Sequence, residues 1–133
     1  MEKGIKENPW KLKTPPGTSE YEMYKDVKDG KEIIVCTVGK TVLHYDARCL
    51  NDLHAMLKKQ GDWMDLGGAD EQKPTKDGTV EDWGRSVKNP VGGWYGLKKG
   101  LRGRFGVYIP PLMEELGLVE LEHNPKNNRM KAK

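Results

Sequence analysis

The sequence has few of the features that mark disulfide-stapled or membrane-embedded proteins. It has two cysteines and one phenylalanine among 133 residues, and it lacks the apolar run of about 18 residues that a membrane-spanning helix needs. Cys36 and Cys49 have neither the number nor the spacing of a disulfide framework or a Cys-x-x-Cys metal site, so we expect reduced, buried thiols. The N-terminus shows no secretory pattern. We therefore expect a soluble, cytoplasmic protein with no cofactor, no metal and no membrane partner.

Net charge is also small, but it is unevenly distributed. The chain has 23 Lys and Arg against 20 Asp and Glu, and its four tryptophans argue against wholesale disorder. Residues 84–113 contain six basic and no acidic side chains, whereas residues 32–83 contain six basic and ten acidic ones. A nearly neutral chain therefore carries one strongly basic segment.

Turn-forming residues suggest where the domain begins. Residues 1–19 mix charged side chains with Pro9, Pro15, Pro16 and Gly17, so we expect a flexible arm through which no regular element runs. The remaining residues, 20–133, are predicted to form a single α+β domain.

The first part of that domain has the pattern of antiparallel strands. Residues 21–27 and 32–38 flank Asp29-Gly30, two residues that tolerate the positive φ angles of a type I′ hairpin turn. Gly39-Lys40 supplies a second turn before residues 41–45. We predict a three-stranded meander whose middle strand is central, because it is apolar on both faces.

A covering helix is predicted after the meander. Leu50, Leu53 and Leu57 share one helical face, Asp46 can cap the start, and Gly61 can end it. Residues 61–78 are predicted to be a long irregular loop. A short helix around Trp83 should follow, opened by Thr79 and stopped by Asn89-Pro90.

The glycine-rich segment 92–106 is the most informative stretch. We predict a helix here, which places an apolar stripe that faces the core beside a basic flank and a glycine face. The stripe is Trp94, Leu97, Leu101 and Phe105, the flank is Lys98, Lys99 and Arg102, and the glycines are Gly96, Gly100 and Gly103. Each interior glycine costs about 0.5–1 kcal/mol relative to alanine. The segment therefore needs a close packing contact, a close ligand, or a shape that is not a continuous helix.

Basic side chains beside small residues are typical of a surface that a phosphate backbone can approach. The predicted nucleic-acid contacts are Lys98, Lys99, Arg102 and Arg104, with Tyr95 stacking on a base and Arg129 adding a contact near the C-terminus. The alternative is a solvated basic face on a helix that packs against its own sheet.

The C-terminal residues 112–133 read as a short helix entered through Pro110-Pro111, closed by Gly117 and followed by a β-hairpin. The run Leu-Gly-Leu-Val and the later Asn-Pro turn resemble the helix and wing of MarR-type winged-helix regulators. That resemblance implies a DNA-binding wing whose tip is formed by Asn124, Pro125, Asn128 and Arg129.

Enzymatic signatures are weak. Gly39-Lys40-Thr41 lies in the predicted hairpin and does not open a helix, so it is not a phosphate-binding loop. Cys49 and His54 diverge on the predicted helix, and the acidic residues 62–71 lack the pattern of a calcium loop. We assign no catalytic residue. The leading interpretation is a non-enzymatic nucleic-acid-binding or regulatory module, and the rival is a protein-interaction or assembly domain, with another protein or a second copy of the chain as partner.

Overall fold

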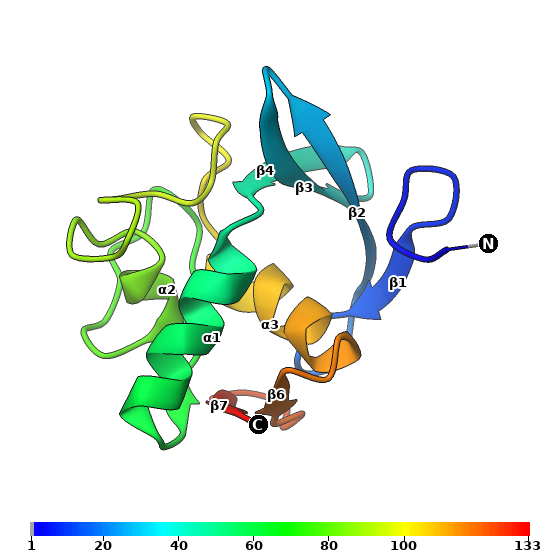
Figure 1. The fold of residues 1–133 in the computed structure, drawn as a ribbon. Helices are drawn as coiled ribbons and strands as arrows, with labels where there is room; N and C mark the ends of the chain where they lie inside the picture. Colours follow the sequence, from blue (N-terminus) through cyan, green and yellow to red (C-terminus); the bar gives the residue numbers. More distant parts are fainter. Residues whose placement is uncertain (1) are drawn as a thin grey trace.

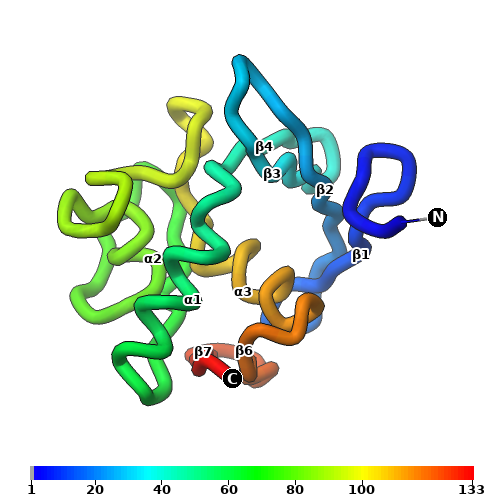
Figure 2. The backbone as a smooth tube through the Cα atoms, in the orientation of Figure 1, coloured from blue at the N-terminus to red at the C-terminus, as the bar shows by residue number. Residues whose placement is uncertain are grey.

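The computed structural model describes residues 2–133 and has an α+β architecture built on two antiparallel sheets (Figure 1). The larger sheet has the order β1-β2-β3-β4, with β1 (Trp10–Lys13), β2 (Glu20–Lys28), β3 (Lys31–Val38) and β4 (Thr41–Asp46). The smaller sheet has the order β5-β7-β6, with β5 (Met64–Asp65), β6 (Val119–Leu121) and β7 (Arg129–Ala132). The helices are α1 (Cys49–Gln60), α2 (Val80–Trp83) and α3 (Phe105–Glu115). Residues 61 to 104, largely irregular, lie on the opposite side of the view from β1 (Figure 2).

The predicted meander is confirmed. Asp29 and Gly30 have φ angles of 53° and 75°, as a type I′ turn requires, and Lys28 lies opposite Lys31 across it. β3 pairs with both β2 and β4, and its residues 33–36 are all buried. Apolar side chains on both faces of one strand therefore identified the centre of the sheet.

A fourth strand corrects the prediction for residues 1–19. Residues 10–13 form β1, which pairs with β2 from Trp10 opposite Met23 to Lys13 opposite Glu20. Trp10 and Leu12 alternate with two lysines and are buried in the core. The nearby prolines flank this strand and do not interrupt it, and an edge strand tolerates such neighbours.

The covering helix α1 is confirmed with its buried stripe of Leu50, Leu53 and Leu57. Gly61 ends it at a φ of 71°, and the Gly61 amide donates to the carbonyl of Leu57. The predicted cap by Asp46 is wrong: α1 begins three residues later, at Cys49, and has no side-chain cap. The Asp46 carboxylate instead accepts the Arg48 amide, in the turn before the helix, at 3.1 Å. Cys36 and Cys49 are free and buried, as expected.

The helices in the second half of the chain differ from the prediction. The Thr79 side chain caps α2 by accepting the Asp82 amide, but the helix ends at Trp83, well before Asn89-Pro90. No helix occupies residues 92–104; the next one, α3, begins at Phe105. Pro110 and Pro111 lie inside α3 and do not open it.

A proline inside a helix normally lowers the stability of that helix by about 3 kcal/mol or more. Both prolines are buried, next to Ile109, Leu112 and Met113 on the same helix. We attribute the position of α3 to this apolar burial, which outweighs the local preference of proline for helix starts.

The C-terminal hairpin is confirmed, and it has an additional neighbour. β6 and β7 pair from Val119 opposite Ala132 to Leu121 opposite Met130. β5, from the loop predicted to be irregular, pairs with the other edge of β7. Gly117, at a φ of 75°, closes the turn before β6.

Candidate nucleic-acid interface

The glycine-rich segment forms an irregular loop that lies along the edge of β4. The Asp46 amide donates to the Tyr95 carbonyl at 2.8 Å, and the Leu97 amide donates to the His44 carbonyl at 2.8 Å. These bonds cover part of a sheet edge that would otherwise expose unpaired backbone groups. The predicted helix over 92–106 is therefore wrong, and the shape is the third of the three possibilities that its glycines allowed.

Two of these glycines show why the segment needs them. Gly100 has a φ of 91°, a conformation that other residues rarely adopt. A Cβ atom on Gly103 would lie 2.3 Å from the backbone nitrogen of Glu71. Gly103 therefore allows close packing between the loop and residues 69–71 of the same chain, whereas Gly100 allows the left-handed backbone of the loop tip.

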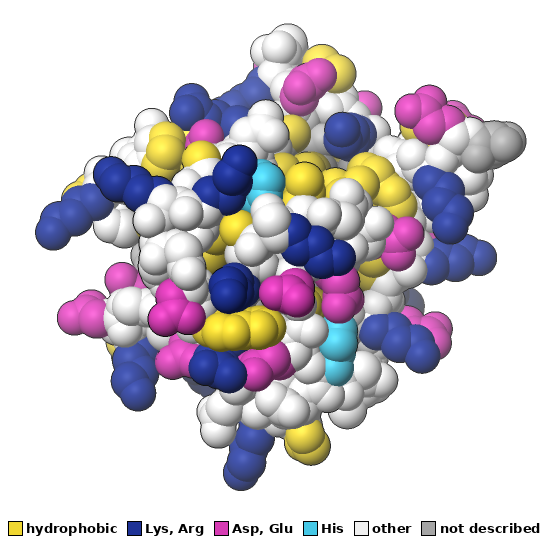
Figure 3. Space-filling view, turned by 60° about the horizontal axis from the view of Figure 1, so that its bottom comes forward, with side chains coloured by type: hydrophobic (Ala, Val, Ile, Leu, Met, Phe, Trp, Pro, Cys, Tyr) yellow, Lys and Arg dark blue, Asp and Glu magenta, His cyan; other side chains and the backbone are white. Residues whose placement is uncertain are grey.

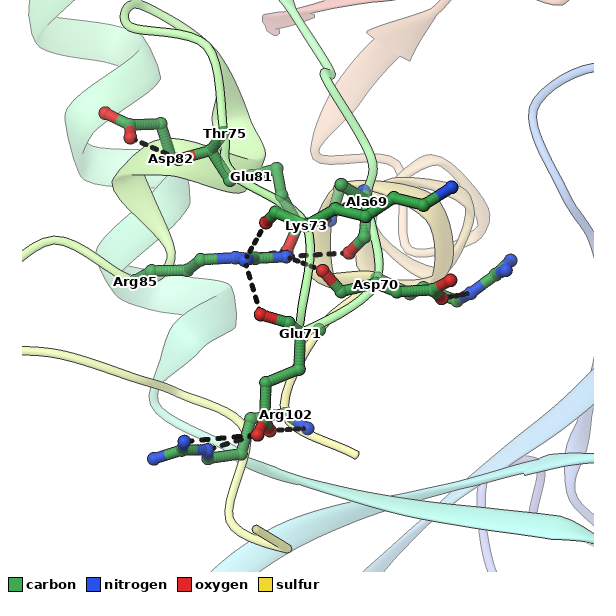
Figure 4. Close-up of polar contacts among 12 residues, drawn as sticks. Ala69, Asp70, Glu71, Lys73, Thr75, Glu81, Asp82, Arg85 and Arg102 are labelled. Atoms are coloured by element: carbon green, nitrogen blue, oxygen red, sulfur yellow. Dashed lines mark hydrogen bonds and ion pairs between the residues drawn. The ribbon is translucent and has the colours of Figure 1, made fainter. Parts of the chain in front are cut away.

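Arg85 anchors this part of the molecule from a largely buried position (Figure 4). Its guanidinium donates at 2.7–3.3 Å to the backbone carbonyls of Ala69, Asp70, Glu71 and Lys73. It also pairs with the Glu81 carboxylate at 3.0 Å.

Glu81 is fully buried and also accepts the Gly106 amide, at the start of α3, at 2.8 Å. Burial raises the pKa of Glu81, whereas the Gly106 amide and Arg85 oppose that rise. One buried ion pair thus connects α2, residues 69–73 and α3.

Glu71 holds the tip of the loop. Its carboxylate accepts the Gly100 amide at 3.0 Å, the Arg102 amide at 2.8 Å and the Arg102 Nε at 2.8 Å. These bonds, the one from the Arg102 side chain foremost, lower the pKa of Glu71 to about 2. Asp70 forms a neighbouring ion pair with Arg104. Two acidic side chains from a segment to which sequence reasoning gave no role therefore neutralise two of the predicted phosphate contacts.

Trp94 lies between two of the arginines. The guanidinium carbons of Arg85 and Arg102 lie 4.8 Å and 4.4 Å from the centre of its ring. The side chain is half-buried, so it does not occupy the core position that the helical pattern predicted. Cation–π contacts of this kind stabilise the loop further.

Tyr95 cannot serve as a stacking platform. It is fully buried, and its ring stacks with those of Trp83 and Phe105 at centroid distances of 5.3 Å and 5.5 Å. Its hydroxyl donates to Asp52 on α1 at 2.8 Å. The prediction that Tyr95 faces a base is wrong, because the segment is a loop whose aromatic side chain completes the core.

The C-terminal candidates also make contacts within the chain. Arg129 pairs with Glu122 at 2.8 Å and lies 5.2 Å from the centre of the Trp63 ring. Asn128 is buried and donates to the Asn124 carbonyl. The face that carries this end of the chain shows positive and negative side chains intermixed (Figure 3). Direct use of Arg129 as a wing-tip contact would therefore require the loss of its ion pair.

Lys98 and Lys99 are the predicted contacts without a carboxylate partner. The Lys98 Nζ donates to the Val42 carbonyl at 3.1 Å, beside β4, and Lys99 is exposed. Burial lowers the pKa of His44, and the charges of Lys98 and Lys28 lower it further. Lys40 is exposed in the turn that leads into β4. We call Lys40, Lys98 and Lys99 the lysine cluster. Sequence reasoning missed Lys40, which lies near the loop because the neighbouring Thr41 lines one hollow with Gly100 and Leu101. Lys28 lies at the opposite end of β3, in the turn from β2.

Metal and membrane sites have no counterpart in the described part of the chain. Within residues 2–133, no group of three or more His, Cys, Asp or Glu side chains could hold a metal ion. None of the described helices is long and apolar enough to cross a membrane.

Comparison with known proteins identifies a family for almost the whole chain. Residues 2–133 match the model of a family of unknown function, DUF6855. The chain belongs to this family. No curated protein matches the chain, and no solved structure matches it. The resemblance of the C-terminal residues to MarR-type regulators stays a prediction.

Proposed function

We propose that the protein is a non-enzymatic nucleic-acid-binding module that contacts phosphates through the lysine cluster. One observation carries the proposal: within residues 2–133, none of these three lysines forms an ion pair, whereas Arg85, Arg102, Arg104 and Arg129 all do. Unpaired lysines gathered near one sheet edge create a positive potential that attracts a polyanion. The free, buried cysteines are consistent with a cytoplasmic location.

The loop that carries two of these lysines is held in place before any ligand binds. Glu71 fixes the backbone on both sides of its tip, and hydrogen bonds to β4 fix its start. A preorganised contact surface loses less conformational entropy on binding than a flexible one. This arrangement supports a recognition role for Lys98 and Lys99, in contrast to the merely structural role of Arg102.

The test compares two lysine pairs that change net charge equally. Lys98→Gln/Lys99→Gln removes two of the three lysines of the cluster, and Lys58→Gln/Lys59→Gln removes an exposed pair from the last turn of α1. Binding of fluorescent oligonucleotides is measured by anisotropy over a range of salt concentrations. We expect the first variant to reduce the slope of log affinity against log salt by about two, and the control to leave it nearly unchanged.

If both double variants reduced the slope equally, the lysine cluster would contribute only through the net charge of the protein, and not as a specific contact site. The absence of binding by the parent protein at low salt would overturn the proposal. Arg102 is left intact in this test, because its replacement would also release Glu71 and the loop.

A protein-interaction role is the second candidate, and one observation favours it. Leu97 and Leu101 are 40% and 36% exposed on the same loop, and exposed apolar side chains that form one patch mark interaction surfaces. A protein partner, or a second copy of this chain, would bury them. Apolar docking responds little to salt, so size-exclusion chromatography at two salt concentrations distinguishes it from polyanion binding.

A further inference from the structure

The outer face of the larger sheet carries a row of side chains that the core does not use. Tyr24, Val35 and His44 lie directly opposite one another on β2, β3 and β4, so their side chains share one face of the sheet. The alternate residues, such as Met23 and Cys36, point into the core. Val35 is only 3% exposed although it lies outside the core cluster. Tyr24 and His44, both half-buried, are the neighbours placed to shield it.

This row has an asymmetric charge environment. On the β4 side, the Lys98 Nζ lies 3.1 Å from the carbonyl of Val42, two residues before His44. Lys28 lies at the far end of β2, two residues beyond Asp26. On the β2 side, Glu22 and Asp26 occupy the positions before and after Tyr24 on the same face. Lys11 on β1 lies opposite Glu22. An anionic chain is therefore attracted along β4 and disfavoured along β2.

We propose that this face binds single-stranded nucleic acid, with phosphates along the lysine cluster and bases stacked over His44 and Tyr24; this inference rests on the proposed function. An aromatic ring on an open sheet face offers a flat surface to an unpaired base, whereas the bases of a duplex already stack on each other. Lysines on one side and aromatic rings on the other match a chain with phosphates on one side and bases on the other. The occupant that fits best is thus a single strand of RNA or DNA.

The decisive variants keep Val35 covered by an apolar side chain at position 24 and change only whether that side chain can stack on a base. Tyr24→Leu retains apolar cover and loses the ring, Tyr24→Phe retains the ring, and Trp63→Leu removes a half-buried ring elsewhere as a control. Each is titrated with oligouridine, oligodeoxythymidine and a hairpin duplex at one salt concentration. We expect Tyr24→Leu to weaken single-strand binding about five- to a hundredfold, and Tyr24→Phe and Trp63→Leu to bind like the parent protein. In NMR spectra, the ring protons of Tyr24 and His44 should shift when the single strand is added.

The outcomes separate this inference from the proposed function. If the duplex binds as tightly as the single strands and Tyr24→Leu changes nothing, while Lys98→Gln/Lys99→Gln still weakens binding, the stacking face is refuted and the proposed function stands. If none of the three nucleic acids binds at low salt, both are refuted. A preference for oligouridine over oligodeoxythymidine, or the reverse, identifies which kind of strand the face accepts.

Discussion

The meander (residues 20–46) and the irregular segment (residues 66–104) are stabilised in different ways. The meander is held by backbone hydrogen bonds between neighbouring strands joined by tight turns, and its inner face is apolar. The irregular segment is held by ionised side chains that bond to backbone groups up to 56 residues away. The comparison shows that basic residues in a stretch without acidic ones are not thereby free for a ligand. Their partners lie in the preceding acidic part of the chain.

The strongest way to sharpen this comparison is to remove Arg85. Arg85→Ala leaves the fully buried Glu81 carboxylate without its cation and takes one donor from each of four carbonyls. We expect a loss of about 3–5 kcal/mol in the free energy of unfolding, measured by urea denaturation. Arg48→Ala is the matched control, because Arg48 pairs with Asp52 at the surface, where such pairs contribute at most about 1 kcal/mol. Similar losses for both variants would show that burial of the ion pair has no special importance.

The apolar half of the comparison is tested by truncating Leu53, the middle residue of the buried stripe of α1. Leu53→Ala should cost about 2–5 kcal/mol, because it removes buried methyl groups and leaves a cavity. The free energy of unfolding of Leu53→Ala and of the parent protein is measured by urea denaturation at low and high salt. Because the contact is apolar, the difference between the two proteins should be nearly the same at both salt concentrations. A loss below about 1 kcal/mol would contradict the central place of this side chain in the core.

A smaller, local effect is expected from Glu71→Gln. The variant removes the charge that attracts Arg102 and the Gly100 amide, so the loop tip should open without global unfolding. We expect the free energy of opening the loop tip to fall by about 1–3 kcal/mol. Amide hydrogen exchange at Gly100 and Arg102 should therefore be faster in Glu71→Gln than in the exposed-site control Glu115→Gln. Unchanged exchange at both amides would show that Glu71 does not hold the loop.

The pH dependence of Glu71 has a definite sign. Because the folded-state pKa is lowered to about 2, its contribution is complete above the unfolded-state pKa of about 4.3 and is lost as the pH falls towards 2. The stability difference between the parent protein and Glu71→Gln should therefore shrink over this range.

The smallest effect is expected from His123, which joins the C-terminal hairpin to the start of the chain. Its Nδ1 lies 2.8 Å from the Pro15 carbonyl and its Nε2 lies 2.7 Å from the Glu114 carboxylate, so only the protonated ring donates to both. The hydrogen bond to Glu114 raises the pKa of His123. Stabilisation should thus be present below about pH 6.5 and be lost as the pH rises through the raised folded-state value. The free energies of unfolding of the parent protein and His123→Gln should differ by less than about 1 kcal/mol at low pH, and the two values should converge at high pH. A difference that stays constant with pH would contradict the ion pair.

The sequence predictions were more accurate for the meander than for the irregular segment. Asp29-Gly30, the leucine stripe of α1, Gly61 and the C-terminal hairpin were predicted correctly, because turn chemistry and hydrophobic periodicity act over a few residues. The helix over 92–106 was wrong, although its apolar spacing suited one. Gly103 packs against the backbone of Glu71, and periodicity contains no information about such a contact.

The candidate site was predicted only in part. Lys98 and Lys99 keep their predicted place in the proposed interface, but Arg102 and Arg104 pair with Glu71 and Asp70. A signal for this pairing existed, since ten acidic residues in 32–83 precede six basic ones in 84–113. Without a contact map, however, that charge balance does not say which carboxylate meets which guanidinium.

By itself, the sequence determined the local elements and the α+β class, because strand alternation, turn residues and helix stripes are set by neighbours along the chain. Only the tertiary structure decided which charges are buried and which remain available. It placed Arg85 and Glu81 inside, turned Tyr95 into the core, and brought Lys98 to the carbonyl of Val42 on β4. The physical reason is that the effect of a charge depends on its partners and on its exposure to water, and both are set by residues distant in the sequence.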